Sequence, residues 1–300
     1  MVNLMLKMKI VIILLLSILL IFWFYTKTLN FKLNLYLIRN DVNVGIATLK
    51  DENLVVVNNK KYPLLSVFKY FVAIKVLKYI DEKHISLNTK LIINQNMLDM
   101  QTYSPMIKDY QNYPFNITLA QLLEYMLSQS DNNACDILIE YSGGIKELER
   151  FIRELGFDDI NIKVNEKDMN SNIYNQYLNT SYPKDIVMMM KMVKENNILS
   201  NHSFTFLENL MLKTSTGENK IKAGLPKNTQ FYHKTGSGSR IPKGIKIADN
   251  DVGYVILPNG DIYYIAIMIK DSPLSDNENA RIISNISKIV YQYFYINKNK

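Results

Sequence analysis

The sequence predicts a mixed α/β fold in which both ends of the chain contribute to one sheet and the middle is helical. Strand-like patterns gather near the two ends, at residues 41–49 and 54–58 and then at 229–235, 252–257 and 262–269. The chain between residues 66 and 217 is instead rich in helical patterns and helix-start signals. Because strands must pair to satisfy their backbone groups, we expect the five of them to meet in a single sheet.

The strands are bounded by recognisable turns. The first two form a predicted hairpin around Asp51-Glu52-Asn53, and the last two are joined by Pro258-Asn259-Gly260-Asp261. The chain should close with a helix, because apolar residues recur there at helical spacing: Ile282, Ile283, Ile286, Ile289, Val290, Tyr293 and Phe294. This stripe can cover one face of the sheet, and core packing is its expected role.

The central helices have clear boundary signals. Residues 66–84 are apolar almost all round, so we expect that helix to be the buried centre of the unit. Thr118 and Gln121 form a predicted capping box for a helix that ends near Gln129. Glycines 143, 144 and 156 are predicted to end helices, and Pro183 to begin one. The Asn-rich residues 157–182 have no period, and a loop of that length inside a compact domain is usually functional.

The N-terminus has the charge and hydropathy order of an export signal. Lys7 and Lys9 precede an apolar run at residues 10–25, and Lys27 follows it. The run is shorter than the ~20 residues that comfortably span a bilayer, but longer than a typical signal core. Bulky residues occupy 23–25, where signal cleavage needs small ones. We expect residues 1–26 to be an uncleaved membrane anchor or, alternatively, a cleaved signal, with the body exported to the periplasmic or cell-envelope side.

Composition excludes several classes of protein. The net charge of +7 comes from lysines that are scattered and not grouped, so we expect no nucleic-acid partner. Cys135 is the only cysteine, which excludes an internal disulfide and a thiolate metal cluster, and we expect it in the core. His84, His202 and His233 lack metal-ligand spacing. We therefore expect no metal site and histidines that are at the surface or half-buried.

A serine and a lysine stand one helical turn apart at the start of the predicted central helix. Ser66 and Lys69 at i and i+3 lie on one face of that helix. Burying the Lys69 charge is costly unless it is paired or loses its proton. A lysine with a depressed pKa can help to remove the serine proton. The pattern is common by chance and carries little weight alone.

Two further polar triplets converge on the same chemistry. Ser130-Asp131-Asn132 lies in a bend between two apolar helices. Lys234-Thr235-Gly236 lies on a strand and is followed by Ser237, which adds an ammonium, two hydroxyls and a glycine that permits close backbone approach. Each triplet alone is also typical of ordinary turns or edge strands without a catalytic role. The three patterns in this order form a specific set.

With these motifs the chain resembles class A serine β-lactamases over nearly all of its length after the N-terminal segment. Further matches are Tyr103-Ser104-Pro105, residues 166–170 (EKDMN), Thr216-Gly217 and residues 251–254. The stretch SDNNACDILIE resembles a branch of class A that is often associated with cephalosporin hydrolysis. The resemblance implies a five-stranded antiparallel sheet flanked by helices, with an α/β lobe from residues 27–58 and 218–300 and an inserted helical lobe at 59–217.

The resemblance also implies hydrolysis of penicillins or cephalosporins through an acyl-enzyme. Ser66 would attack the lactam carbonyl, with Lys69 in the proton relay and the N–H groups of Ser66 and Ser237 as the oxyanion hole. Ser130 would pass a proton to the leaving nitrogen. Glu166 would activate the deacylating water, held together with Asn170. Whether Lys69 or Glu166 is the acylation base stays open.

For substrate binding, the resemblance assigns Asn132 to the acylamide side chain and Tyr103 to the cleft wall. The rim Lys234, Thr235, Gly236 and Ser237 would bind the substrate carboxylate. Many relatives add an arginine there. Here the nearby cations are Lys220, Lys222 and Arg240, and the choice among them stays open, as does substrate preference, since residues 241–250 look irregular.

The main alternative is a penicillin-binding D,D-peptidase, which shares Ser66, Lys69, Ser130 and Lys234. Glu166 favours the lactamase, because D,D-peptidases lack an efficient deacylating base. A non-catalytic scaffold is disfavoured by the full set of polar positions. We expect a monomer that needs no cofactor, with a small β-lactam as its partner.

Overall fold

The central sheet has five antiparallel strands in the spatial order β2-β1-β9-β8-β7. In this computed structural model, residues 26–40 and 42–296 are described. The strands are β1 (Val44–Lys50), β2 (Asn53–Val57), β7 (Phe231–Ser237), β8 (Lys246–Ile256) and β9 (Ile262–Ser272). The predicted antiparallel sheet from both chain ends and its two tight hairpins are confirmed.

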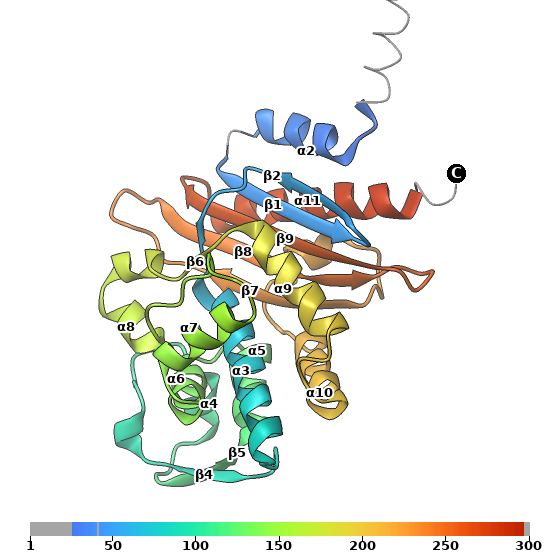
Figure 1. Cartoon of the computed structure of the whole chain (residues 1–300). Helices are drawn as coiled ribbons and strands as arrows, with labels where there is room; N and C mark the ends of the chain where they lie inside the picture. The colour runs from blue at the N-terminus through green and yellow to red at the C-terminus, as the bar shows by residue number, and fades with distance from the viewer. Residues whose placement is uncertain (1–25, 41, 297–300) are drawn as a thin grey trace, which may run out of the picture.

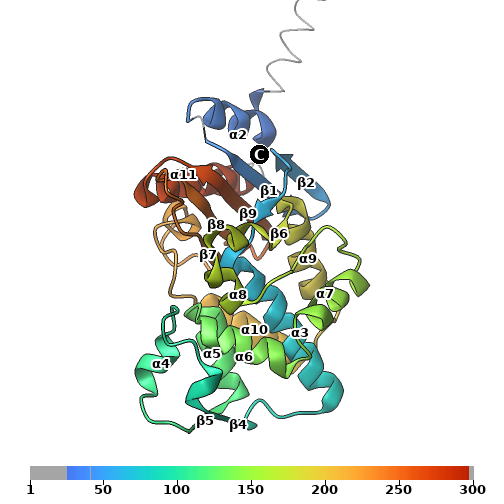
Figure 2. The same cartoon turned by 90° about the vertical axis from the view of Figure 1, so that its left-hand side faces the viewer.

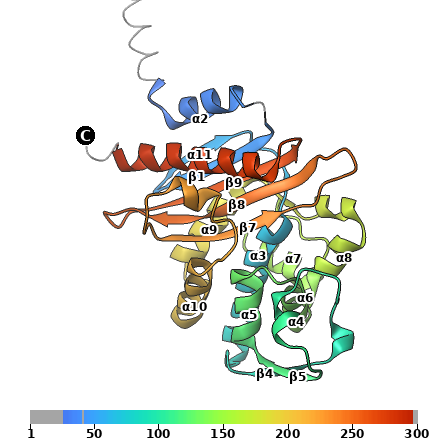
Figure 3. The same ribbon diagram turned by 180° about the vertical axis from the view of Figure 1, so that it is seen from behind.

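Both faces of the sheet are buried by helices, and the side chains of each strand alternate between the two faces. On β9, Tyr263, Ile265 and Ile267 pack on one face against α2 (Leu29–Ile38) and α11 (Asp276–Ile296). Their neighbours Tyr264 and Ala266 pack on the other face. There α9 (Pro183–Glu195) covers the sheet (Figures 1 and 3).

The remaining helices lie below the sheet, at the side opposite α2 (Figure 2). They are α3 (Phe68–Lys83), α4 (Pro105–Asp109), α5 (Leu119–Ser128), α6 (Asn132–Tyr141), α7 (Ile145–Glu154), α8 (Glu166–Ser171) and α10 (Asn201–Leu212). Short 3-10 turns are η1 (Leu65–Val67), η2 (Gln95–Met97), η3 (Ile173–Tyr177) and η4 (Ile221–Gly224). Two small ribbons pair β3 (Tyr62–Pro63) with β6 (Thr180–Ser181) and β4 (Lys90–Ile93) with β5 (Phe115–Thr118).

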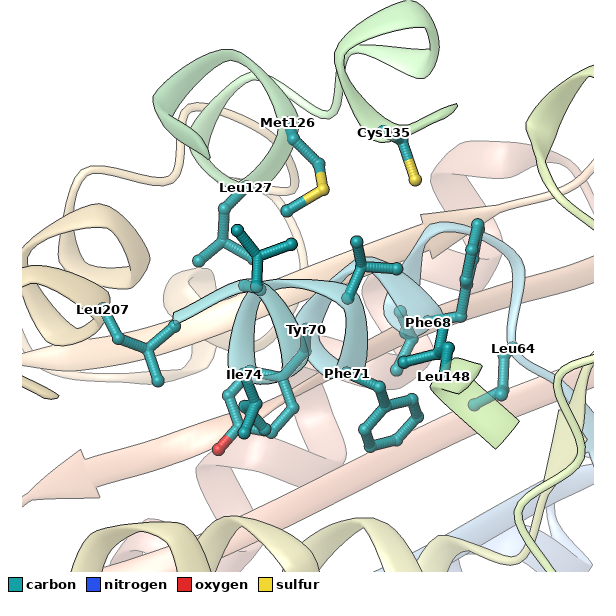
Figure 4. Packing of buried hydrophobic residues seen from close by; sticks show 14 of the residues in the cluster. Leu64, Phe68, Tyr70, Phe71, Ile74, Met126, Leu127, Cys135, Leu148 and Leu207 are labelled. Atoms are coloured by element: carbon teal, nitrogen blue, oxygen red, sulfur yellow. The ribbon is translucent and has the colours of Figure 1, made fainter. Parts of the chain in front are cut away.

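Helix α3 is the buried centre of the helical part, as its sequence predicts. Phe68, Phe71 and Ile74 have almost no exposed surface, and α5, α6, α7 and α10 surround them (Figure 4). The capping box at Thr118 and Gln121 begins α5 as expected. Cys135 is buried on α6, and burial raises the pKa of its thiol.

Strand β8 differs from its prediction, because it begins at Lys246 and not near Val252. The three consecutive polar residues Asp249, Asn250 and Asp251 have partners in the sheet or beside it. Asp249 pairs with Lys220, Asn250 donates to the Pro63 carbonyl, and Asp251 contacts His233. Tertiary contacts therefore override local β propensity. His233 is consequently buried, and the expectation of a surface or half-buried side chain was wrong for it.

The anchor prediction rests on residues that lie outside the described part. Within residues 26–40 and 42–296, no helix combines the length and the apolar character required to cross a bilayer. The lobe boundaries stay a prediction, and α9, from the range assigned to the helical lobe, packs on the sheet.

We predict that Leu127→Ala lowers the free energy of unfolding by about 2–5 kcal/mol, because it removes a fully buried side chain and leaves a cavity beside α3. Leu212→Ala is the matched control, since Leu212 is 43% exposed, and it should change stability by less than about 0.5 kcal/mol. Urea denaturation measures both. Equal losses in the two variants would contradict the packing described.

Candidate active site

A cavity of about 970 Å³ opens where β7, α8 and the turn before α6 meet. Eight of the predicted site residues line it: Ser66, Tyr103, Ser130, Asn132, Glu166, Asn170, Thr235 and Ser237. Lys69 and Lys234 have no exposed surface. The structure thus gathers residues that are up to 171 positions apart along the chain, as the range from Ser66 to Ser237 shows.

Ser66 lies in the 3-10 turn η1, directly before α3. Strand β7 passes close to this turn at Gly236. A Cβ at that position would lie 2.4 Å from the Leu64 carbonyl oxygen, so a glycine is required for the approach. Asn250 on β8 fixes the same turn, because its amide donates to the Pro63 and Leu64 carbonyls at 2.8 and 3.1 Å. The sheet therefore sets the position of the serine.

The Lys69 ammonium joins three segments of the chain. Its Nζ donates to Ser66 Oγ at 3.1 Å, to the Ser130 carbonyl at 2.7 Å and to Asn132 Oδ1 at 2.6 Å. These bonds use its three donors. Glu166 Oε1 lies 2.8 Å from the same nitrogen as an ion pair, without the alignment of a hydrogen bond. Lys69 thus binds the serine, the turn before α6 and the carboxylate on α8 together.

A second buried ammonium lies on the other side of Ser130. Lys234 Nζ donates to Ser130 Oγ at 2.9 Å and to the Thr235 carbonyl at 3.1 Å. Burial, together with the charges of Lys69 and Lys220, holds the pKa of Lys234 well below its usual range. The Ser130 hydroxyl is therefore positioned by a cation.

The turn that presents Ser130 is held by Asp131. Its carboxylate is fully buried, accepts from Ala134 N and caps α6. It also accepts from Ser104 Oγ and Met106 N, both at 2.7 Å. Ser130 itself adopts φ +64°, a left-handed conformation that costs free energy unless its surroundings enforce it. The hydrogen bonds of Asp131 hold the turn in this conformation.

The segment 157–182 is long but firmly attached. Asp136 on α6 accepts from the N–H groups of Glu166 and Lys167 at 2.8 and 2.9 Å. Burial raises the pKa of Asp136 to about 7, although these two N–H bonds favour the carboxylate. Asn179 holds the segment before α8 through the N–H of Lys163 and both backbone groups of Val164. Glu166 is consequently fixed and only 4% exposed.

Thr102 joins two predicted site amides. Its hydroxyl accepts from Asn132 Nδ2 at 2.8 Å and from Asn170 Nδ2 at 2.9 Å. Beside it, the Tyr103 carbonyl accepts from Asn132 N, while the Tyr103 side chain is 55% exposed at the cavity rim. Thr102 therefore joins the start of α6 to α8 at the cavity wall.

Of the three candidate cations near the carboxylate site, Lys220 lines the cavity beyond β7. Lys220 donates to Ser237 Oγ at 3.0 Å and pairs with Asp249 at 2.5 Å. Lys222 pairs with Glu218 at the surface, and Arg240 pairs with Asp276. Thr216 Oγ1 lies 2.6 Å from Thr235 Oγ1 in the same corner.

Sequence reasoning missed Thr102, Gln176 and Asp249. Thr102 directly precedes the Tyr103-Ser104-Pro105 match, and Gln176 exchanges two hydrogen bonds with Ser239, which ties the loop to the chain after β7. None of the three carries a motif, so only the packing reveals them. Within the described ranges, no three His, Cys, Asp or Glu side chains gather in an arrangement that could hold a metal ion.

Comparison with known proteins agrees with this geometry. The model of the β-lactamase enzyme family matches residues 32–294. A β-lactamase of Bacteroides uniformis is 43% identical over 83% of this chain and 85% of its own length. β-Lactamase VEB-1 of Pseudomonas aeruginosa is 35% identical over 91% and 92%.

Solved structures give the same result. A class A β-lactamase from Bacteroides cellulosilyticus superposes with a TM-score of 0.86 at 40% identity, covering 89% of this chain and 98% of that one. The TLA-3 extended-spectrum β-lactamase gives 0.87 at 36% identity, covering 90% and 99%. The chain therefore belongs to the β-lactamase enzyme family, as a class A serine β-lactamase.

Proposed function

We propose that this enzyme opens β-lactam rings through an acyl-enzyme on Ser66 and releases the product with a water activated by Glu166. The observation that carries the proposal is the position of Lys69 Nζ, 3.1 Å from Ser66 Oγ and 2.8 Å from Glu166 Oε1. One buried ammonium thereby connects the nucleophile with the proposed deacylating base.

Proton balance decides what this cluster does in acylation. An ammonium that donates three hydrogen bonds cannot accept the proton of Ser66. Lys69 becomes a base once it passes a proton to Glu166, whose Oε1 has no hydrogen-bond partner in the resting site. Alternatively, Glu166 takes the serine proton through a water. In both routes the proton ends on the Lys69–Glu166 pair, and Oγ of Ser66 bonds to the lactam carbonyl carbon.

The leaving nitrogen needs a proton as the lactam C–N bond breaks. We assign this step to Ser130: its hydroxyl gives its proton to the nitrogen and takes one back from the Lys69–Glu166 pair, whose Lys69 ammonium donates to the Ser130 carbonyl. This transfer returns Glu166 to the carboxylate form that deacylation needs. Lys234 stabilises the charge that develops on Ser130 Oγ, because it already donates to that oxygen at 2.9 Å. The N–H groups of Ser66 and Ser237 are the proposed oxyanion hole.

The remaining residues are proposed to orient the substrate. Asn132 takes the acylamide side chain, Tyr103 forms the wall, and Lys234, Thr235 and Ser237 receive the carboxylate. Gly236 allows β7 to approach the serine. Asn170 is proposed to hold the deacylating water with Glu166, and its hydrogen bond to Thr102, which it shares with Asn132, supports this.

We predict that Glu166→Gln retains acylation but slows deacylation by about 10²–10⁴-fold, the usual contribution of a positioned general base. Intact-mass spectrometry after brief exposure to a cephalosporin should show a persistent adduct on the variant and a transient one on the wild type. Turnover at the wild-type rate would remove Glu166 from this step. Glu218→Gln, a change at the surface ion pair with Lys222, is the matched control and should leave turnover unchanged.

A chromogenic cephalosporin separates the proposed activity from that of a D,D-peptidase. The full chain should hydrolyse it with many turnovers per molecule, because Glu166 is fixed beside the nucleophile by Asp136. A single stoichiometric burst followed by a stable adduct would instead favour the penicillin-binding alternative.

We also propose a monomer that is exported to the periplasmic or cell-envelope side and tethered by the apolar run at residues 10–25. Expressed with its own N-terminus, the protein should remain in the membrane fraction after a salt wash and be released by detergent. A soluble product whose N-terminus lies near Thr26 would show signal cleavage instead.

A further inference from the structure

The corner proposed to receive the substrate carboxylate contains a carboxylate of its own. Asp249 lies directly opposite Ser237 in the β7–β8 ladder and lines the cavity. Its side chain is 3% exposed. Asp249 neutralises the buried Lys220, but it also places a negative charge where an incoming anion would be repelled.

Asp249 uses the donors that a substrate carboxylate would need. Its Oδ1 lies 2.5 Å from Lys220 Nζ and accepts from Ser237 Oγ at 3.0 Å. A hydroxyl has one proton, so the Ser237 hydroxyl points its proton at Asp249 and accepts from Lys220 at 3.0 Å. Lys220 also donates to the Asn250 carbonyl at 3.2 Å. Lys220 and Ser237 are therefore both engaged inside the protein.

We propose that Asp249 is a specificity-determining residue that competes with the substrate carboxylate for Lys220 and Ser237, and so reduces the preference of the enzyme for anionic over uncharged β-lactams. The inference rests on the proposed function, because it assumes that the substrate carboxylate binds beside Lys234, Thr235 and Ser237. An acid substrate must displace the internal carboxylate or bind beside it. A substrate that lacks the negative charge meets no such repulsion.

The test compares a chromogenic cephalosporin with its methyl ester at the ring carboxylate. The ratio of the two kcat/KM values on one protein sample does not depend on how much of the sample is folded. Asp249→Asn should raise the acid-to-ester ratio about tenfold, chiefly through a lower KM for the acid, because one buried negative charge is removed near the bound carboxylate. Asp159→Asn, at a surface ion pair with Lys61, is the matched control and should leave the ratio unchanged.

A second pair of variants keeps the proposal testable if Asp249→Asn folds poorly. Lys220→Gln leaves Asp249 without its cation, so the acid-to-ester ratio should fall. In the double variant Lys220→Gln/Asp249→Asn the ratio should recover by about the same factor, because the uncompensated anion is gone. A ratio that is unchanged or lower in Asp249→Asn, or a double variant that stays as low as Lys220→Gln, would overturn the proposal. A wild type that hydrolyses neither substrate would instead contradict the proposed function.

Discussion

The site is organised by the cost of burying the Lys69 charge. Burying an ammonium with no exposed surface costs free energy, and pairing with hydrogen bonding reduces that cost. Here its partners come from η1, from the turn before α6 and from α8, three segments that are far apart along the chain. Satisfying Lys69 therefore fixes the relative positions of Ser66, Ser130 and Glu166. The surrounding supports, Asp131 beneath the turn and Asp136 beneath α8, restrict each segment to that arrangement.

The three buried lysines around the cavity differ in whether a carboxylate pairs with them. Lys69 is paired with a carboxylate, whereas the acceptors of Lys234 among the described residues are neutral: the Ser130 hydroxyl and the Thr235 carbonyl. Lys220 is again paired, with Asp249. The unpaired cation is thus held next to the proposed leaving-group donor, with a depressed pKa that reflects burial and its cationic neighbours. The carboxylate of the proposed substrate would give Lys234 an anionic partner as it binds.

Much of this fold could be predicted from sequence because its local signals agree with its packing. The hairpins around Asp51 and Asn259, the capping box at Thr118 and the apolar helix after Ser66 each carry a physical pattern. The first half of β8 could not be predicted, since its polar residues find partners only in three dimensions. The same holds for Thr102 and for the choice of Lys220 over Arg240, which depend on contacts between distant segments. The order of the motifs identified the candidate catalytic residues. It did not reveal the hydrogen bonds that connect them across distant segments.

In the proposed mechanism, Ser66 is acylated and then released within this network. The most direct measurement is rapid-quench peptide mapping of the wild-type enzyme during turnover of a slowly hydrolysed cephalosporin. We expect an adduct confined to Ser66 that appears within the first turnover and disappears when substrate is exhausted. Hydrolysis with no adduct at Ser66, or with an adduct at another side chain that forms and decays at the turnover rate, would contradict it.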